Sequence, residues 1–275
     1  MTGEARVASD FSAPEPDDEP LFILGCVRSG TTLTRDLLRQ VPNVICPEET
    51  HFFRWTEPFR SPSGTRPYRG NKVLIHHREI DAVEETSYLS LLEDSCSKAE
   101  LQRRYVHAFA TAKGLSEPYR WFDKTPQNIQ GAALIAQEFP RATFLHLVRN
   151  PLNVVASLSA GRQIKIPDIH GACNVWLEAI QISKTLRAAF PERVLQVRYE
   201  DLVTDVPKTM EKILSFAGFD ADATAFSKAD ARRERNLWVQ DLTEDEAQVV
   251  VERCGRLALE QGYDIAAEVA ARNET

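Results

Sequence analysis

A short apolar segment that runs directly into a glycine-rich loop and then into a helix constrains this chain more than any other feature of its sequence. Residues 21–24 read Leu-Phe-Ile-Leu and stop at Gly25, which predicts a buried strand. Residues 31–40 have the spacing of an amphipathic helix. The intervening Gly-Cys-Val-Arg-Ser-Gly-Thr-Thr, residues 25–32, is typical of a loop that holds a phosphate on backbone amides and a helix N-terminus.

The loop departs from the nucleoside triphosphatase pattern at one informative position. Its spacing matches G-x-x-x-x-G-K-[ST], but Thr31 stands where that pattern has lysine. A triphosphatase needs this lysine and a metal ion at the β- and γ-phosphates. The sequence therefore favours a ligand with a simpler 5′ end, with Arg28 as a cation inside the loop. The alternative is a tight strand-to-helix turn with a capping serine or threonine.

Strand-like and helix-like segments alternate along the rest of the chain. Further strands are expected at 44–46, 120–123, 143–148 and 194–199, with helical segments between them. This alternation predicts an α/β, P-loop-like three-layer fold with a central, mostly parallel sheet flanked by helices. Ligands of such folds bind at the carboxyl ends of the strands. Residues 57–80, rich in proline and glycine, are expected to form a long irregular binding loop.

Composition restricts the class of protein. The net charge is −7 over 275 residues, which disfavours a nucleic-acid binder and requires local cations for any anionic ligand. Five scattered cysteines without a CxxC pair indicate neither a disulfide framework nor a metal site, as expected in the cytoplasm. No apolar run is long enough for a membrane span. We expect a disordered acidic leader over residues 1–19 and one domain over 20–275.

A second candidate for anion binding follows the strand at 143–148. Arg149 at the strand end offers a planar fork suited to a phosphate. Asn150 and Pro151 are suited to cap and begin a helix, and Ser157 lies two turns into it. The alternative is a surface ion pair at Arg149, which is common and weak.

These two motifs together resemble the PAPS-dependent sulfotransferase family, which uses 3′-phosphoadenosine 5′-phosphosulfate (PAPS) as donor and needs no metal. The resemblance implies that Arg149 and Ser157 bind the 3′-phosphate, and that Tyr199, in Val-Arg-Tyr-Glu-Asp-Leu, lies beside the adenine. It also assigns the 5′-phosphosulfate to the loop, through Arg28, Ser29, Gly30, Thr31 and Thr32.

The resemblance also indicates a catalytic base. Residues 47–53 read Pro-Glu-Glu-Thr-His-Phe-Phe, similar to the Glu-Glu-Thr of tyrosylprotein sulfotransferases and the Glu-x-His-Phe-Phe of heparan sulfate sulfotransferases. In both branches the glutamate that matches Glu49 is the proposed general base. His51 is either a rival base or a hydrogen-bond partner. Glu48 is expected to be a solvated neighbour.

The expected catalytic cation is Lys124, in Phe-Asp-Lys-Thr-Pro. It resembles the lysine that donates to the bridging oxygen in the cytosolic and tyrosylprotein branches. Pro126 occupies the place of the catalytic histidine of the cytosolic branch, which favours Glu49 as the base. Arg232 and Arg233 do not reproduce the Arg-Lys-Gly of those enzymes, and a solvated loop is expected there.

The sequence thus predicts a sulfotransferase that transfers a sulfuryl group from PAPS to an acceptor hydroxyl of a sugar, phenol, tyrosine or small metabolite. Two other hypotheses remain open at this point. One is a metal-dependent phosphotransferase or kinase on a P-loop fold. The other is a non-catalytic binder of adenosine 3′,5′-bisphosphate.

Overall fold

A computed structural model describes residues 19–55, 57–61, 65–116, 118–161, 164–227 and 236–273. The predicted acidic leader lies outside these residues except for Glu19, as do Arg232 and Arg233.

Five parallel strands form the central sheet, in the order β2-β3-β1-β4-β5. The strands are β1 (Leu21–Gly25), β2 (Val44–Ile45), β3 (Arg120–Lys124), β4 (Thr143–Val148) and β5 (Val194–Arg198). All five residues of β1 are buried, as expected for a central strand covered on both faces. The predicted α/β class with a parallel sheet is confirmed.

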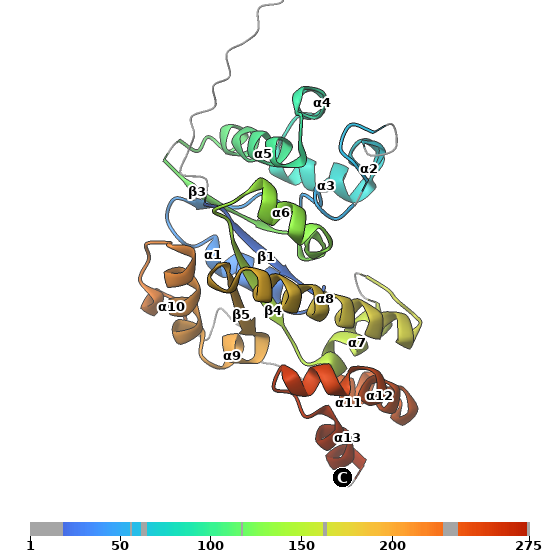
Figure 1. Cartoon of the computed structure of the whole chain (residues 1–275). Helices are drawn as coiled ribbons and strands as arrows, with labels where there is room; N and C mark the ends of the chain where they lie inside the picture. The colour runs from blue at the N-terminus through green and yellow to red at the C-terminus, as the bar shows by residue number, and fades with distance from the viewer. Residues whose placement is uncertain are drawn as a thin grey trace, which may run out of the picture.

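Helices cover both faces of the sheet, which lies between them in Figure 1. Leu21 and Ile23 point into a core shared with α1 (Thr31–Leu38), α9 (Tyr199–Thr204) and α10 (Val206–Ala217). Phe22 and Leu24 point to the opposite core, built with α6 (Ala132–Glu138), α7 (Pro151–Ala160) and α8 (Ile169–Ala189). The alternation of side chains along β1 therefore anchors two cores.

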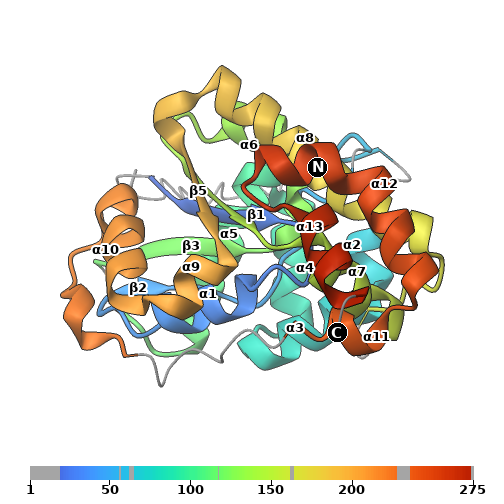
Figure 2. The ribbon, with the colours of Figure 1, turned by 90° about the horizontal axis from the view of Figure 1, so that it is seen from below.

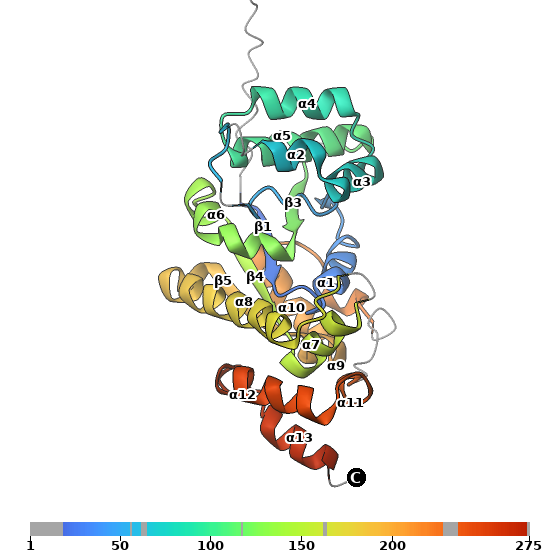
Figure 3. The ribbon, with the colours of Figure 1, turned by 90° about the vertical axis from the view of Figure 1, so that its right-hand side faces the viewer.

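Two groups of helices lie beyond the sheet at opposite ends of the molecule (Figure 3). One group is α2 (Arg66–Gly70), α3 (Lys72–Asp81), α4 (Glu85–Asp94) and α5 (Lys98–Ala112). The other is α11 (Trp238–Asp241), α12 (Glu244–Glu260) and α13 (Ile265–Asn273), which Figure 2 shows gathered beside α7. Short 3₁₀ turns are η1 (Pro126–Gly131), η2 (Pro191–Arg193) and η3 (Ala223–Ala225).

The prediction of an irregular segment over residues 57–80 is wrong for its second half, which forms α2 and most of α3. Pro67 lies in the first turn of α2, where its missing N–H costs no hydrogen bond. Asn71 begins α3, because its side chain accepts hydrogen bonds from the amides of Val73 and Leu74. The proline and the polar residues mark helix starts here, not a loop.

The topology defines where a ligand can bind. Strand β1 leads into α1 on one face of the sheet, and its neighbour β4 leads into α7 on the other face. Adjacent parallel strands whose connections depart to opposite faces leave a crevice at their carboxyl ends. The glycine-rich loop follows β1 and Arg149 follows β4, so both candidate anion-binding motifs lie at this crevice.

Candidate active site

The glycine-rich loop is a tight turn with unusual backbone angles. Gly25, Arg28 and Gly30 have φ values of 149°, 75° and 92°, and Gly30 is the N-cap of α1. Because glycine has no side chain to cap the helix and the first turn carries no acidic residue, the first amides of α1 are not capped from this position. The hydroxyl of Ser29 is buried and has no hydrogen-bond partner among the described residues. A loop of this kind suits an anion that accepts hydrogen bonds.

Tyr199 packs directly on Gly30. A Cβ atom at position 30 would lie 2.1 Å from Cδ2 of the Tyr199 ring, so only glycine fits beneath it. The guanidinium carbon of Arg149 lies 4.7 Å from the centre of the same ring, in a cation–π contact. The ring of Tyr199 therefore connects the glycine-rich loop to the end of β4.

Direct hydrogen bonds join the two anion-binding motifs. Nε of Arg28 donates to Oγ of Ser157 at 2.9 Å, and Nη1 of Arg149 donates to the carbonyl oxygen of Arg28 at 3.0 Å. The indole Nε1 of Trp176 donates to the carbonyl oxygen of Arg149 at 3.0 Å and holds that strand end in place. Arg28 and Arg149, 121 positions apart, are thus joined at the carboxyl ends of β1 and β4 through the Arg149 side chain and the Arg28 backbone.

The predicted base and the predicted cation are ion-paired. Nζ of Lys124, at the buried end of β3, contacts Oε1 of Glu49. His51 lies on the other side of the same carboxylate, with Nε2 3.4 Å from Oε2 of Glu49. Burial lowers the pKa of His51 to about 4, against the opposing effect of Glu49. The imidazole is therefore neutral near pH 7 and suits a neighbour of the carboxylate better than its counter-ion.

A buried carboxylate fixes the segment that carries Glu49. Asp123 accepts hydrogen bonds from the hydroxyl of Thr50 at 2.8 Å, the hydroxyl of Thr125 at 3.2 Å and the amide of Asn128 at 3.0 Å. Burial raises the pKa of Asp123 to about 6, although these hydrogen bonds oppose the shift. In addition, the amide of Thr50 donates to Oγ1 of Thr125. The Glu49 segment is therefore tied to β3 on one side.

Glu48 is not the solvated neighbour that the sequence predicted. Its carboxylate accepts from Arg35 at 2.6 Å and from Arg39 at 3.1 Å, and only 15% of its side chain is exposed. Burial alone would raise the pKa of Glu48, but the two guanidinium groups hold it below its ordinary value. The carboxylate of Asp81 accepts from the backbone amide of Glu48. Glu48 thus fastens the same segment to α1.

The backbone of Glu49 has a third anchor in α3. Nδ1 of His77 lies 2.9 Å from the carbonyl oxygen of Glu49, and since a carbonyl only accepts, Nδ1 carries the proton. The His77 ring stacks on His51 with centroids 5.9 Å apart and planes within 10°. A narrow pocket borders Glu49 and His77. No sequence motif indicated His77.

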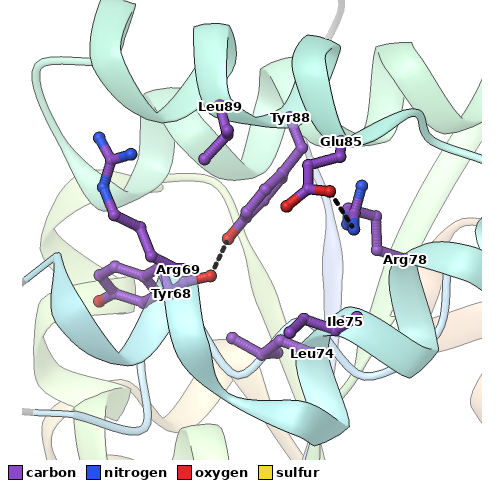
Figure 4. A pocket seen from close by; sticks show the side chains of 8 residues that line it. All are labelled: Tyr68, Arg69, Leu74, Ile75, Arg78, Glu85, Tyr88 and Leu89. Carbon is purple, nitrogen blue, oxygen red and sulfur yellow. Dashed lines mark hydrogen bonds and ion pairs between the residues drawn. The ribbon is translucent and has the colours of Figure 1, made fainter.

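A second narrow pocket adjoins the first, since Leu74, Arg78 and Tyr88 line both. Figure 4 shows its walls, with the Tyr88 hydroxyl bonded to the backbone of Tyr68 and the Arg78 guanidinium paired with Glu85. Helices α2, α3 and α4 supply these side chains. The helical group α2–α5 therefore forms hollows beside the Glu49 segment.

Most of the predicted site residues come together in two neighbouring groups. Arg28, Gly30, Arg149, Ser157 and Tyr199 contact one another, and Glu49, His51 and Lys124 form the second group. Register brings the groups close, because Ile23 of β1 pairs with Lys124 of β3. Thr31 is buried in the first turn of α1 and Thr32 is exposed there.

Across the described part of the chain, no three His, Cys, Asp or Glu side chains gather in a way that could hold a metal ion. The same residues include no helix that is long and apolar enough to cross a membrane.

Comparison with known proteins bears on this geometry. The model of the sulfotransferase family matches residues 20–223, which hold every strand and both groups of candidate residues. The chain belongs to the sulfotransferase family. The resemblance inferred from the loop and from the Arg-Asn-Pro motif is confirmed.

The chain is also similar, at low identity, to two proteins of known sequence. Protein-tyrosine sulfotransferase 2 of Gallus gallus is 27% identical over 72% of this chain and 50% of its own length. Nodulation protein NoeE of Sinorhizobium fredii is 23% identical over 88% of this chain and 65% of its own. The chain thus spans about half to two thirds of the length of these relatives.

Solved structures agree on the fold. The sulfotransferase domain of the Synechococcus PCC 7002 olefin synthase superimposes with a TM-score of 0.59 at 25% identity, covering 83% of this chain and 86% of that domain. The sulfotransferase domain of the curacin biosynthetic pathway superimposes with a TM-score of 0.57 at 19% identity, covering 89% and 98%.

Proposed function

We propose that this chain is a sulfotransferase that moves the sulfuryl group of PAPS to an acceptor hydroxyl. The observation that supports it most is the contact of Arg28 with Ser157 and of Arg149 with the Arg28 backbone. These contacts join the two candidate anion-binding motifs into one continuous site. A nucleotide that carries phosphate groups on both the 3′ and the 5′ side of its ribose requires such a site. Membership of the sulfotransferase family supports the type of reaction.

The donor would lie along the carboxyl ends of β1 and β4. Arg149 and Ser157 would bind the 3′-phosphate, and Tyr199 would contact the adenine. The 5′-phosphosulfate would bind to the glycine-rich loop. There the buried Ser29 Oγ has no hydrogen-bond partner among the described residues and offers a hydroxyl donor. Arg28 lies between these ends, since its side chain reaches Ser157 while its backbone belongs to the loop.

Glu49 would act as the base. The acceptor oxygen attacks sulfur, its proton passes to the Glu49 carboxylate, and the bond between sulfur and the bridging phosphate oxygen breaks. The electron pair of that bond remains on the leaving adenosine 3′,5′-bisphosphate, where Lys124 would donate a hydrogen bond. The Lys124–Glu49 ion pair holds the two groups side by side before the reaction. His51 would orient the carboxylate as a neutral neighbour.

The acceptor would approach from the α2–α5 group, since the cavities bordered by Glu49, His77 and Tyr88 lie there. A tyrosine, a phenol, a sugar or a small metabolite each supplies a suitable hydroxyl. We also propose a cytoplasmic location, in keeping with five cysteines that are all free thiols. Fractionation of the native cells tests it.

Transfer of labelled sulfate from PAPS to a panel of tyrosine peptides, phenols, sugars and small metabolites tests the activity. With an accepted substrate, Glu49→Gln should lower kcat by about 10²–10⁴-fold, the usual contribution of a general base. Arg149→Ala should raise the Kd for adenosine 3′,5′-bisphosphate about 10- to 100-fold, because a hydrogen bond to a charged group contributes ~1.5–3 kcal/mol. Exposed Glu79→Gln on α3 and Arg141→Ala serve as charge-matched controls.

The other two hypotheses give different results in the same assays. A non-catalytic binder would bind the bisphosphate and show no turnover with any acceptor, and Glu49→Gln would not change its Kd. A phosphotransferase would turn over ATP with magnesium. Our role assignments fail if Glu49→Gln weakens nucleotide binding while Arg149→Ala lowers only kcat.

A further inference from the structure

The C-terminal helices α11–α13 lie outside the segment that matches the family, which ends at residue 223. Helices α11 and α12 nevertheless pack on α7 and α8, the helices that follow Arg149, and α13 packs on α12 (Figure 3). Helix α12 contributes Ala247, Val250 and Cys254, all fully buried, to the core that α7 and α8 share. This segment is therefore part of the folded unit that carries the candidate donor site.

Two side chains of this segment reach the ends of β4 and β5. The hydroxyl of Tyr263 donates to Oε2 of Glu200 at 2.6 Å, and its ring is 3% exposed. Both carboxylate oxygens of Glu268 accept from the amide of Asn150 at 2.9 Å. Asn150 and Glu200 directly follow Arg149 and Tyr199 in the chain.

These contacts close into one chain of hydrogen bonds. The backbone amide of Asn150 donates to Oε1 of Glu200 at 3.0 Å, so Tyr263, Glu200, Asn150 and Glu268 are linked in sequence. The guanidinium of Arg198 lies 4.3 Å from the centre of the Tyr263 ring. The ends of the two strands are thereby held to each other and to the C-terminal helices.

We infer that Tyr263 and Glu268 are positioning residues of the donor site, which hold Arg149 and Tyr199 in place for the 3′-phosphate and the adenine. This inference rests on the proposed function. A phosphate contact depends on sub-ångström placement of its donor, and a side chain is placed by the backbone next to it. Asn150 and Glu200 fix that backbone one residue beyond each ligand-binding side chain.

An alternative role predicts the opposite sign for one variant. Glu268 is a half-buried anion whose pKa is raised by burial and by the nearby Glu200. If it acted only through its charge, Glu268→Leu would remove a repulsion and tighten the binding of an anionic nucleotide. A positioning role predicts weaker binding, because Asn150 loses both acceptors.

Calorimetry with adenosine 3′,5′-bisphosphate tests the inference on the full chain. Tyr263→Phe and Glu268→Leu should each raise the Kd about 10-fold, equivalent to ~1.4 kcal/mol. The matched control is Glu260→Gln, which removes an exposed carboxylate of α12 that pairs with Lys184 and touches neither strand end. Its Kd should equal that of the unaltered chain.

A second ligand separates positioning from loss of folded protein. Adenosine 5′-monophosphate keeps the adenine but lacks the 3′-phosphate. Glu268→Leu, which acts beside Arg149, should therefore bind it almost as the unaltered chain does, whereas Tyr263→Phe, which acts beside Tyr199, should lose part of its affinity. In steady-state kinetics both variants should raise the KM for PAPS and leave kcat near its original value. A merely structural role would reduce the active fraction, and therefore kcat, with the same KM.

The outcomes distinguish the inference from the function on which it rests. If the unaltered chain does not bind the bisphosphate, the proposed function fails. If it binds and both variants keep the Kd of Glu260→Gln, or if Glu268→Leu binds more tightly, the positioning role is overturned. Should Tyr263→Phe not fold, Glu268→Leu carries the test, since its side chain is only half-buried.

Discussion

Replacing Gly30 with alanine should destabilise the protein far more than the same change at another glycine of positive φ. The new Cβ would lie 2.1 Å from Cδ2 of Tyr199, whereas carbon atoms pack at about 3.5–4.0 Å. The ring must therefore retreat by about 1.5 Å, which disturbs its contact with the Arg149 guanidinium at 4.7 Å. We expect a loss of about 2–5 kcal/mol from backbone strain and overpacking together.

Gly114 supplies the matched control. It also has a positive φ, of 66°, but no heavy atom lies within 4 Å of its ideal Cβ. Gly114→Ala should therefore cost only the backbone term of about 1–2 kcal/mol. Urea unfolding followed by circular dichroism gives both values on the same scale.

A double-mutant cycle identifies the cause of the difference. In a Tyr199→Ala background the space over position 30 is open, so Gly30→Ala should cost no more than Gly114→Ala does. If Gly30→Ala and Gly114→Ala cost the same in the unaltered background, the packing of Tyr199 on the loop is refuted. A coupling energy near zero would refute it equally.

Two further predictions concern the buried polar groups. Burial lowers the pKa of His146 in β4 to about 4, so the unfolded chain, with a histidine pKa near 6.5, binds the extra proton between these values. The stability from neutral His146 is complete above pH ~6.5 and is lost as the pH falls to 4. Between pH 7 and 4.5, the free energy of unfolding of the unaltered chain should therefore fall by about 2–3 kcal/mol relative to that of His146→Leu, as urea titrations can measure. Thr50→Val removes a hydrogen-bond donor from buried Asp123 and should lower the stability by about 1–3 kcal/mol. It should also lower kcat, because the segment that carries Glu49 loses a contact with β3; an unchanged melting curve and kcat would contradict this.

The elements that sequence predicted best are those with purely local causes. The run at residues 21–24 is apolar at every position because β1 is covered on both faces, and Gly25 stops it where a Cβ would lie 2.6 Å from the carbonyl oxygen of Leu147. Asn150 caps α7 through its side chain, as the Asn-Pro pair indicates. The glycine-rich loop and the Arg-Asn-Pro motif were recognisable because each is contiguous in the chain.

Other features depend on distant contacts that no local pattern contains. Glu48 is paired because Arg35 of α1 and the C-cap residue Arg39, one turn apart, both point toward it. Their i, i+4 spacing was a signal that could have suggested an acidic partner. Tyr263 and Glu268 reach residues 63 and 118 positions away, and nothing near them in the sequence indicates a partner. The roles assigned to individual site residues remain predictions.

An acidic protein that binds a doubly phosphorylated nucleotide must neutralise its own acidic groups near the ligand. The chain carries a net charge of −7, yet Arg28 and Arg149 adjoin at the crevice between β1 and β4. Glu200, in α9 just after β5, accepts hydrogen bonds from the Tyr263 hydroxyl and the Asn150 amide, and Glu49 is paired with Lys124. Because these carboxylates are hydrogen-bonded or paired with a cation, the guanidinium groups of Arg28 and Arg149 can set the local field that an anionic donor meets. The positioning role proposed for the C-terminal helices agrees with this reasoning, because without Tyr263 the Glu200 carboxylate would lose a hydrogen bond close to Arg149.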